Sequence, residues 1–418
     1  MYSYTVDKTK YCRSCKSNSL SLVWELAPSP YGDQFKNSQL EALALEKSSL
    51  TLMFCDNCKL LQISEIPNFT EIYSNYLYRT TVTNALDSYY HQLSSRLIFE
   101  YKLGAKSTVV DIGSNDGTFL NFFKNQGIET LGIEPTITSA NQAISKGIRT
   151  FNGFLNLKAC EFIKDNSQTI DLISINYTLA NIDDLKSVFE LLVNLMSDKT
   201  VLSIVTGYHP DQFLINMFEY INHDHLTYFT VKTLQRICSS FGLKIIDVSR
   251  IEHKGGSINV IISKNSASWL AQSSVGQLIQ REEWLNCNDK SFASNLKVNI
   301  GQVSSEISKF INTGKFKKIY GIGASISTTH LINQFNLAKS LTSIFDDDPN
   351  KHYKFAPGTG LKVVPLSELP NAPEDAVVIL AWQHTNKIFE RLKELNYSGK
   401  IMIPLPSPKI TSLEMLRL

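Results

Sequence analysis

Four cysteines stand in two closely spaced pairs whose spacing suits a tetrahedral metal site. Cys12 and Cys15 form one CxxC pair, and Cys55 and Cys58 form the other. A CxxC turn directs two thiolates at one ion, and two such turns supply the closed four-sulfur shell of a structural zinc site. We therefore predict a structural Zn2+ ion. Two alternatives stay open, namely four buried thiols without a metal and a redox dithiol, which accounts for only one pair.

A loop with two glycines is the second group of residues that could do chemistry. An apolar run ending at Asp111 leads into Gly113 and Gly117, and a helix is expected from about Thr118. Glycine lets a backbone approach a ligand closely, as in other nucleotide-binding loops. The order DxGxxxG differs from the GxGxxG of dinucleotide loops and resembles motif I of class I methyltransferases, which lies against the methionine part of S-adenosylmethionine. The loop residues assigned to this cofactor are Asp111, Gly113, Ser114, Asn115, Asp116 and Gly117.

Residues after the next two apolar runs would complete the cofactor site. Glu134 ends the first of these runs, where a carboxylate could accept hydrogen bonds from both ribose hydroxyls, although an acid there could also be a helix cap or a surface acid. The positions after the following run are where an adenine ring would be held. The further residues assigned to the cofactor are Glu134, Pro135, Asn152, Gly153, Phe154 and Asn176.

The elements that must position these residues form an alternation of apolar runs and helical patterns, which indicates an α/β fold with parallel strands. The strands expected around the cofactor are 108–112, 130–133, 172–175, 201–205, 244–248 and 258–262. A polar helical stretch follows at 266–313, and a second alternation has expected strands at 318–320, 341–345, 361–364, 376–380 and 400–403. We predict a small, irregular zinc-binding domain over 1–75, a Rossmann-like methyl-donor domain over 76–300 and a Rossmann-like substrate-binding domain over 301–418.

Composition limits the classes of function. The 418 residues suffice for two or three domains, and 41 basic against 39 acidic residues give a net charge of +2, which argues against a dedicated nucleic-acid binder. No run of about 18 apolar residues is present, so no membrane span is expected. The first residues lack an apolar signal core, and the seven cysteines are unevenly spread. We expect reduced thiols and a cytoplasmic location.

Taken in order, these motifs resemble those of the three-domain sugar C-methyltransferases that act on nucleotide-linked 4-keto deoxysugars. The resemblance runs from Cys12 to about Pro408. Besides the cysteine pairs and the glycine loop, it includes the aromatic segment 73–79, the segments 223–229 and 255–257, and the later segments 321–324, 346–350, 380–382 and 403–406. It implies S-adenosylmethionine and zinc as cofactors and a nucleotide-diphosphate sugar as substrate. We expect no nucleic-acid or membrane partner, and a monomer.

The resemblance also implies a reaction. The ketone acidifies the neighbouring C–H, a base removes that proton, donors stabilise the enolate oxygen, and the carbon takes the methyl group. We assign the base to His225, oriented by Asp224, although a buried structural histidine is the alternative. The family's active-site tyrosine corresponds to Tyr76 or Tyr78, the latter assigned to the substrate, although tyrosines in such a stretch are usually core residues.

Three departures from the family pattern fall at the proposed chemistry. Asn181 and Asn222 stand where the family commonly has a histidine and a tyrosine, and both are kept as catalytic candidates. Amides can donate hydrogen bonds but cannot relay protons at neutral pH. The family's His-Gly-Gly-Ser-x-Arg also differs here, with Lys254 before the glycines and Asn259 in place of the arginine. Altered or lost chemistry is therefore one alternative.

A second glycine loop lies in the C-terminal part. It has two glycines of a dinucleotide fingerprint but lacks the third, and a carboxylate ends the next strand. The resemblance implies that this domain holds the sugar nucleotide, with the diphosphate at a helix N-terminus. The residues assigned here are Gly321, Gly323, Ala324, Ser325, Asp346, Lys351 and Trp382. A purely structural turn, an NAD-dependent sugar-nucleotide oxidoreductase and a zinc-containing RNA methyltransferase remain alternatives.

Overall fold

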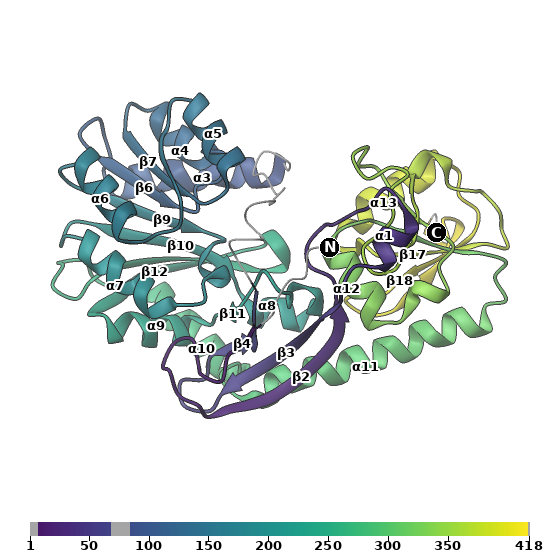
Figure 1. Cartoon of the computed structure of the whole chain (residues 1–418). Coiled ribbons are helices and arrows are strands. Elements are labelled where there is room, and N and C mark those ends of the chain that lie inside the picture. The colour runs from purple at the N-terminus through teal and green to yellow at the C-terminus, as the bar shows by residue number, and fades with distance from the viewer. Residues whose placement is uncertain (1–6, 68–83, 417–418) are drawn as a thin grey trace.

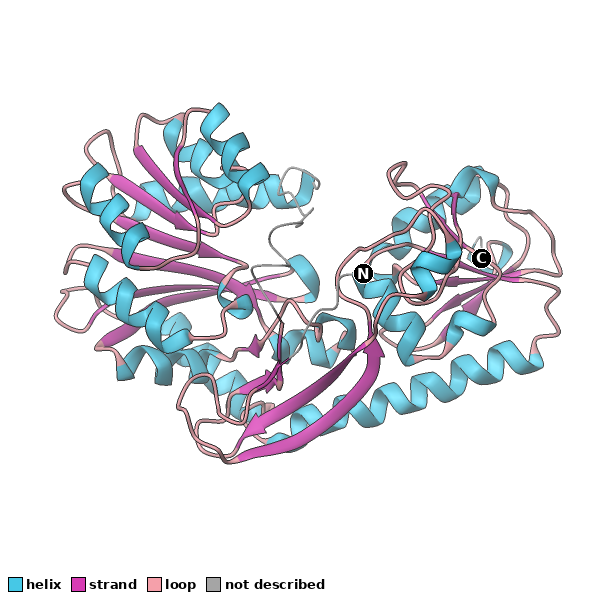
Figure 2. Ribbon diagram, in the orientation of Figure 1, coloured by secondary structure: helices cyan, strands magenta, loops and turns pink. Residues whose placement is uncertain are grey.

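The structure is a computed structural model and describes residues 7–67 and 84–416. Two α/β domains lie side by side above a base formed by a long strand hairpin and one long helix (Figure 1). Both domains place helices around a central sheet (Figure 2). The α/β class predicted from the alternating pattern is confirmed.

The central domain is built on a seven-stranded sheet of order β12-β13-β10-β9-β6-β7-β8. Its strands are β6 (Thr108–Ile112), β7 (Glu129–Glu134), β8 (Arg149–Asn152), β9 (Leu172–Asn176), β10 (Val201–Gly207), β12 (Leu243–Ile251) and β13 (Ser257–Lys264). Its helices are α3 (Asn84–Glu100), α4 (Thr118–Lys124), α5 (Ile137–Ser145), α6 (Leu157–Asn166), α7 (Leu185–Leu195), α8 (His209–Leu214), α9 (Val231–Ser240) and α10 (Ser273–Trp284). Val109 and Val110 belong to different apolar clusters, because successive side chains on a strand point to opposite faces, and helices cover both.

One expectation about this sheet is wrong. All six strands were predicted to be parallel, but β13 runs antiparallel to both of its neighbours, β10 and β12. The reason is the connection, since only a short turn containing the 3-10 segment His253–Gly255 joins β12 to β13. A parallel pair needs a longer crossover than this turn provides.

The N-terminal segment differs from the small, irregular unit that we expected. Two long strands, β2 (Leu20–Ser29) and β3 (Ser48–Cys55), form a hairpin that reaches from the cysteines to the C-terminal domain (Figure 1). β4 (Leu61–Ile63) and β11 (Thr227–Tyr228) complete its sheet. Trp24 and other apolar residues of the hairpin share one cluster with the C-terminal core. β2 carries apolar side chains along its full length. Burying them requires a larger partner surface than a small zinc-binding unit offers, which explains why the hairpin packs on the C-terminal domain. Two short strands, β1 (Asp7–Lys8) and β5 (Glu65–Ile66), pair with each other, and α1 (Gln39–Leu43) follows β2.

The C-terminal domain has a six-stranded sheet of order β16-β15-β14-β17-β18-β19. Its strands are β14 (Ile319–Ile322), β15 (Ile344–Asp346), β16 (Val363–Pro365), β17 (Ala376–Ile379), β18 (Lys400–Ile403) and β19 (Lys409–Thr411), and all are parallel except the last. Its helices are α12 (Ile326–Gln334) and α13 (Thr385–Glu394). The expected helical connection at 266–313 is formed by α10 and by α11 (Lys290–Thr313), which runs along the base of the molecule (Figure 1).

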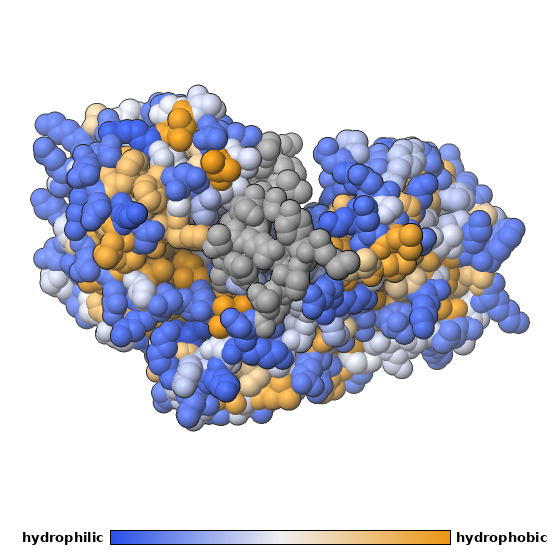
Figure 3. Space-filling view, in the orientation of Figure 1, coloured by the Kyte–Doolittle hydropathy of each residue, from blue (hydrophilic) through white to orange (hydrophobic). Residues whose placement is uncertain are grey.

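The surface view shows hydrophilic residues over most of one face, with hydrophobic patches between them (Figure 3). Over residues 7–67 and 84–416, no helix combines the length and the apolar character needed to cross a bilayer.

Candidate active site

A cavity of about 1490 Å³ lies between the central and C-terminal domains. On the central side it lies at the carboxyl ends of β6, β7 and β9, where ligands bind in open α/β sheets. On the other side it reaches the start of α12 and the 3-10 segment Trp382–His384. The volume exceeds the few hundred Å3 typical of a single-ligand site, so two ligands can meet in it.

The glycine loop is packed so tightly that only glycine fits at its first turn. Gly113 has φ +77°, and a Cβ there would lie 2.2 Å from Thr178 Oγ1. Asn115 also has a positive φ, 50°, and its backbone N–H donates to Glu134 Oε2 over 2.9 Å. The other carboxylate oxygen, Glu134 Oε1, accepts from the Thr136 N–H over 2.8 Å. Two backbone donors thus fix this carboxylate at the cavity wall, which suits the predicted ribose contact.

Asp111 links two strand ends on the glycine-loop side of the cavity. It is buried, and its Oδ1 accepts from Ser174 Oγ at 2.6 Å and from Asn176 Nδ2 at 3.2 Å. Burial raises the pKa of Asp111 to about 7, and the two donors oppose that rise. Asp111 therefore holds the ends of β6 and β9 together beneath the cavity.

The structure brings together nine of the twelve residues that we assigned to the cofactor. Those that line the cavity are Asp111, Gly113, Ser114, Asn115, Glu134, Pro135, Gly153, Phe154 and Asn176. Asp116, Gly117 and Asn152 do not line it. Asp116 accepts from the Thr118 hydroxyl and pairs with Lys146, and Gly117 packs against Ile148. Asn152 Nδ2 donates to the carbonyls of Glu134 and Pro135 and so supports the end of the neighbouring strand.

His225 also lines the cavity, but its orientation differs from the expected one. His225 Nδ1 lies 2.9 Å from the Tyr220 carbonyl oxygen, and its ring stacks on the Tyr220 ring with centroids 4.0 Å apart. The carbonyl takes the orienting role that we gave to Asp224. Burial lowers the pKa of His225 to about 4, and the positive charge of Lys254 adds to this. His225 is therefore neutral at physiological pH.

Three more catalytic candidates line the cavity. Asp224 is partly buried, and burial raises its pKa to about 6, with repulsion by Asp33 adding to the shift. Asn222 Oδ1 accepts from the Asp224 N–H at 3.0 Å, and Asn181 belongs to the 3-10 segment after β9. Asp224, Asn222 and Asn181 all line the cavity. Tyr76 and Tyr78 lie outside the described residues.

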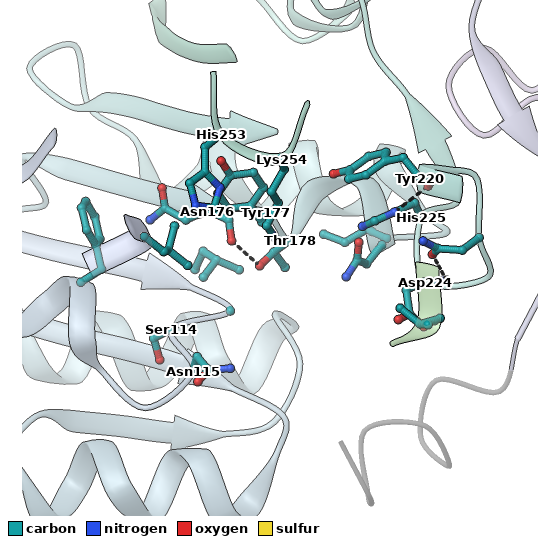
Figure 4. A pocket seen from close by; sticks show the side chains of 18 of the residues that line it. Ser114, Asn115, Asn176, Tyr177, Thr178, Tyr220, Asp224, His225, His253 and Lys254 are labelled. Atoms are coloured by element: carbon teal, nitrogen blue, oxygen red, sulfur yellow. Dashed lines mark hydrogen bonds between the residues drawn. The ribbon is translucent and has the colours of Figure 1, made fainter. Parts of the chain in front are cut away.

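Sequence reasoning missed a group of cavity residues that surrounds the point where the two halves meet. Tyr177 follows β9, and His253 and Lys254 lie in the β12–β13 turn (Figure 4). The Lys254 Nζ lies 4.0 Å from the centroid of the Tyr177 ring. Only the family pattern around the two glycines drew attention to Lys254, and no signal singled out Tyr177.

The C-terminal domain contributes fewer of its predicted residues. Ser325, Lys351 and Trp382 line the cavity, whereas Gly321, Gly323, Ala324 and Asp346 do not. Asp346 Oδ2 accepts from the Ala324 N–H at 2.7 Å, so this carboxylate closes its own loop. One backbone N–H at the start of α12 is not available to a ligand, because the Ile326 N–H already donates to Asp33. Lys387 also lines the cavity and was not predicted.

A buried carboxyl joins the two halves of the cavity. Glu219 Oε1 accepts from Trp382 Nε1 at 2.6 Å and from Gln383 Nε2 at 3.2 Å. Its side chain is 1% exposed, and burial raises its pKa to about 7. The bond fixes Trp382, from the C-terminal domain, against the central domain.

Glu219→Gln is expected to stabilise the protein at pH 8 but not at pH 5. A carboxyl whose folded-state pKa lies above the unfolded value stabilises the fold most at low pH, and this contribution is lost as pH rises through about 7. The shift corresponds to on the order of 3 kcal/mol, which the neutral amide avoids while still accepting from Trp382. Urea unfolding at both pH values measures this, with Glu161→Gln on the exposed surface as control. An equal difference at the two pH values would contradict the assignment.

The four predicted metal ligands form a cluster. The sulfur atoms of Cys12, Cys15, Cys55 and Cys58 lie within 4.8 Å of one another, with 3.4 Å between Cys12 and Cys58 and 3.6 Å between Cys15 and Cys55. Tetrahedral Zn–S bonds of about 2.3 Å place sulfurs close to these separations. The cluster therefore fits a zinc ion, with no open ligand position for catalysis.

Three family models match successive parts of the chain. Residues 12–73 match a model described as "Putative zinc binding domain", residues 78–248 one described as "Methyltransferase domain", and residues 252–406 one described as "C-methyltransferase C-terminal domain". A curated relative, the C-methyltransferase NovU of Streptomyces niveus, is 21% identical over 407 residues, which cover 96% of this chain and 97% of NovU.

Solved structures similar to part of the chain include the PH0226 protein from Pyrococcus horikoshii OT3, with 10% identity over 46% of this chain and 98% of that chain and a TM-score of 0.38. A SAM dependent methyltransferase from Archaeoglobus fulgidus is 19% identical over 42% of this chain and 94% of that chain, with a TM-score of 0.33. TM-scores this low support no conclusion about function.

Proposed function

We propose that this chain, which matches the three-domain family of C-methyltransferases from the cysteine cluster to the C-terminal domain, transfers a methyl group from S-adenosylmethionine to a carbon of a nucleotide-linked ketosugar. The observation that carries the proposal is the single cavity in which the Gly113 loop and the start of α12 face a shared space. The relative NovU supports C-methylation.

The cofactor half supports S-adenosylmethionine through its shape and its acceptors. The backbone at Gly113 leaves no room for a side chain, and Glu134 presents a carboxylate held by two backbone donors. Phe154 and Leu155 supply apolar surface where a purine would lie. When bound, the cofactor supplies an electrophilic methyl group, which the chain has only to orient.

The substrate half supports a nucleotide diphosphate through its cations. Lys351 and Lys387 line the cavity, as do Ser325 and Ser327, which offer hydroxyl donors. Since Asp33 already accepts from the first N–H of α12, the lysines rather than the helix end would carry most of the attraction for the diphosphate. Trp382, fixed by Glu219, gives an aromatic surface for the sugar or base.

Between these halves lie groups that can manage a proton. A ketone acidifies the neighbouring C–H, so the chain needs a base for the acceptor carbon and a donor for the enolate oxygen. His225 and Lys254 both line this part of the cavity, while Asn181 and Asn222 can donate to sugar oxygens. The cysteine cluster would hold zinc in a purely structural role.

Calorimetry with S-adenosylhomocysteine tests the first half of the proposal. We expect one site per chain in the zinc-loaded protein, and no binding by a folded sample would contradict the proposal. A screen of nucleotide-linked 4-ketosugars, starting with thymidine diphosphate 4-keto-6-deoxyglucose, should then show a mass gain of one methyl group.

The variant Lys351→Met separates the two halves of the site. Because Lys351 lies on the C-terminal side, the variant should keep its affinity for S-adenosylhomocysteine and raise the KM for the sugar nucleotide by roughly 10-fold. Equal loss of affinity for both ligands would contradict the division of the cavity into two halves.

A further inference from the structure

A short 3-10 segment, Phe218–Tyr220, lies between the N-terminal hairpin, the central domain and the C-terminal domain. A 3-10 helix has three residues per turn, so three successive side chains point about 120° apart. All three residues of this segment are buried. Each side chain can therefore contact a different part of the molecule, and the contacts show that each does.

Phe218 fixes the segment against the hairpin and the C-terminal domain. Its ring centroid lies 6.0 Å from that of Trp24 in β2 and 5.5 Å from that of Phe335 at the end of α12. The residue before it, Met217, packs on the β12–β13 turn, where a Cβ on Gly255 would lie 2.1 Å from Met217 Sδ. The segment is thus held by packing on two sides.

Tyr220 points toward the central domain and contacts His225. The His225 Nδ1 lies 2.9 Å from the Tyr220 carbonyl oxygen, and the two rings stack with centroids 4.0 Å apart (Figure 4). A Cβ on Gly207, at the end of β10, would lie 2.6 Å from the Tyr220 hydroxyl. Because a carbonyl oxygen only accepts, Nδ1 carries the proton and Nε2 has the lone pair. Tyr220 therefore sets both the place and the tautomer of His225.

Glu219 points toward the C-terminal domain. Its Oε1 accepts from Trp382 Nε1 at 2.6 Å and from Gln383 Nε2 at 3.2 Å, and both donors belong to residues that line the cavity. An indole has a single N–H, so this bond determines where the polar edge of the Trp382 ring lies. Glu219 does not itself line the cavity. Any effect on a bound ligand must therefore pass through Trp382 and Gln383.

Two adjacent residues of one segment thus hold cavity residues of two different domains. The Cα atoms of Glu219 and Tyr220 are one peptide bond, about 3.8 Å, apart. The path from Trp382 to His225 consists of the carboxylate bond, this peptide unit and the carbonyl bond. A movement of Trp382 relative to His225 would break one of these two hydrogen bonds.

We propose that Glu219 is a positioning residue for methyl transfer, a role that rests on the proposed function. By fixing Trp382 and Gln383 relative to His225, Glu219 sets where an acceptor held by the C-terminal domain lies with respect to the methyl donor. Reacting atoms must be aligned closely, and a misplacement of about 1 Å can lower a rate roughly 100-fold. A carboxylate outside the cavity can therefore have a large effect on the reaction.

Steady-state kinetics with thymidine diphosphate 4-keto-6-deoxyglucose give the first test. Glu219→Met removes the acceptor while keeping the length of the side chain, and should lower kcat/KM roughly 100-fold, with KM raised and kcat lowered. Glu219→Gln, whose amide oxygen can accept the same bonds, should stay within about 3-fold of wild type. The Kd for S-adenosylhomocysteine should not change in either variant, because the Gly113 loop belongs to the central domain.

A double-mutant cycle separates positioning from a general loss of packing. Trp382→Phe removes the donor and keeps an aromatic ring. If the two residues act through one bond, the double variant should be about as active as the less active single variant. Asn216→Gly is the matched control, because it removes another hydrogen bond between the same domains, from Asn216 Nδ2 to the Pro406 carbonyl at 2.8 Å. Its φ of 57° suits glycine, and kcat/KM should stay at the wild-type value.

NMR of the histidine side chains tests the coupling without any substrate. In protein with 15N-labelled histidine, His225 is assigned as the signal missing from His225→Gln. This signal should shift in Glu219→Met and in Trp382→Phe, although Trp382 is linked to His225 only through the 218–220 segment. It should stay in place in Asn216→Gly. Circular dichroism checks that each variant is folded.

The outcomes separate this proposal from the proposed function. If wild type methylates the sugar but Glu219→Met keeps its kcat/KM, or if the two losses add in the double variant, Glu219 is not a positioning residue. An unshifted His225 signal in Glu219→Met would also overturn the coupling. If wild type methylates no nucleotide-linked ketosugar, the proposed function fails, and the His225 signal still decides whether Glu219 links the two domains.

Discussion

Gly113→Ala is expected to weaken binding of S-adenosylhomocysteine by roughly 100-fold, because a shift of about 1 Å in such a loop displaces every contact it makes. The new Cβ would lie 2.2 Å from Thr178 Oγ1 and 2.8 Å from Thr178 Cγ2. Either the loop or the residue after Tyr177 must move, and both line the cavity. The measurement is the calorimetric Kd for protein shown by circular dichroism to be folded.

Gly127 offers a control with the same backbone strain and no overlap. Its φ is +74°, close to that of Gly113, but a Cβ there would meet nothing within 4 Å. Gly127→Ala should therefore lose about 1 kcal/mol of stability, with no change in affinity. Adding Thr178→Gly to Gly113→Ala should restore part of the binding. Wild-type affinity in Gly113→Ala alone would show that the loop does not hold the cofactor.

The sequence predicted the strands of the central sheet and the glycine turn after β6 well because their signals are local. Strand β6, the turn at Gly113 and helix α4 follow one another within a short segment, and each residue type reports its own backbone conformation. The four cysteines could likewise be recognised locally, from the CxxC spacing within each pair. The strand predicted over 108–112 matches β6 residue for residue.

The contacts between distant segments could not be predicted in this way. Tyr177 and Lys254 each have a positive φ that neither residue type favours, so the pattern gave no warning that they meet. No pattern in the sequence marked Glu219, because its partner Trp382 comes from the other domain. The orientation of His225 depends on a backbone carbonyl, which carries no identity in the sequence.

The β2–β3 hairpin shows a second limit. Its apolar residues indicate strands, but the pattern does not say which core they join. The cysteines suggested a separate knot, whereas Cys12 and Cys55 belong to the apolar cluster of the central domain and Trp24 to that of the C-terminal domain. The N-terminal segment thus connects the two domains that form the cavity.

Through this connection, the cysteine cluster supports part of the cavity wall. Buried Arg13, next to Cys12, donates to Asp183 Oδ1 at 2.8 Å and to the Glu65 carbonyl at 2.9 Å. Asp183 lines the cavity two residues after Asn181. Arg236 of α9 donates to the Cys58 carbonyl at 2.6 Å. Unfolding of the cysteine turns would therefore release the segment that carries Asn181.

Cys15→Ser is expected to lose the single zinc ion per chain and to lower Tm by roughly 10 °C or more, since a structural zinc site contributes several kcal/mol to folding. Cys160→Ala, which removes a buried thiol outside the cluster, is the matched control and should keep the metal. Elemental analysis and a thermal scan measure both. Because the Gly113 loop lies outside the released region, the affinity for S-adenosylhomocysteine should fall far less than the rate of methyl transfer. A variant that keeps one zinc ion and the wild-type Tm would contradict the assignment of four sulfur ligands.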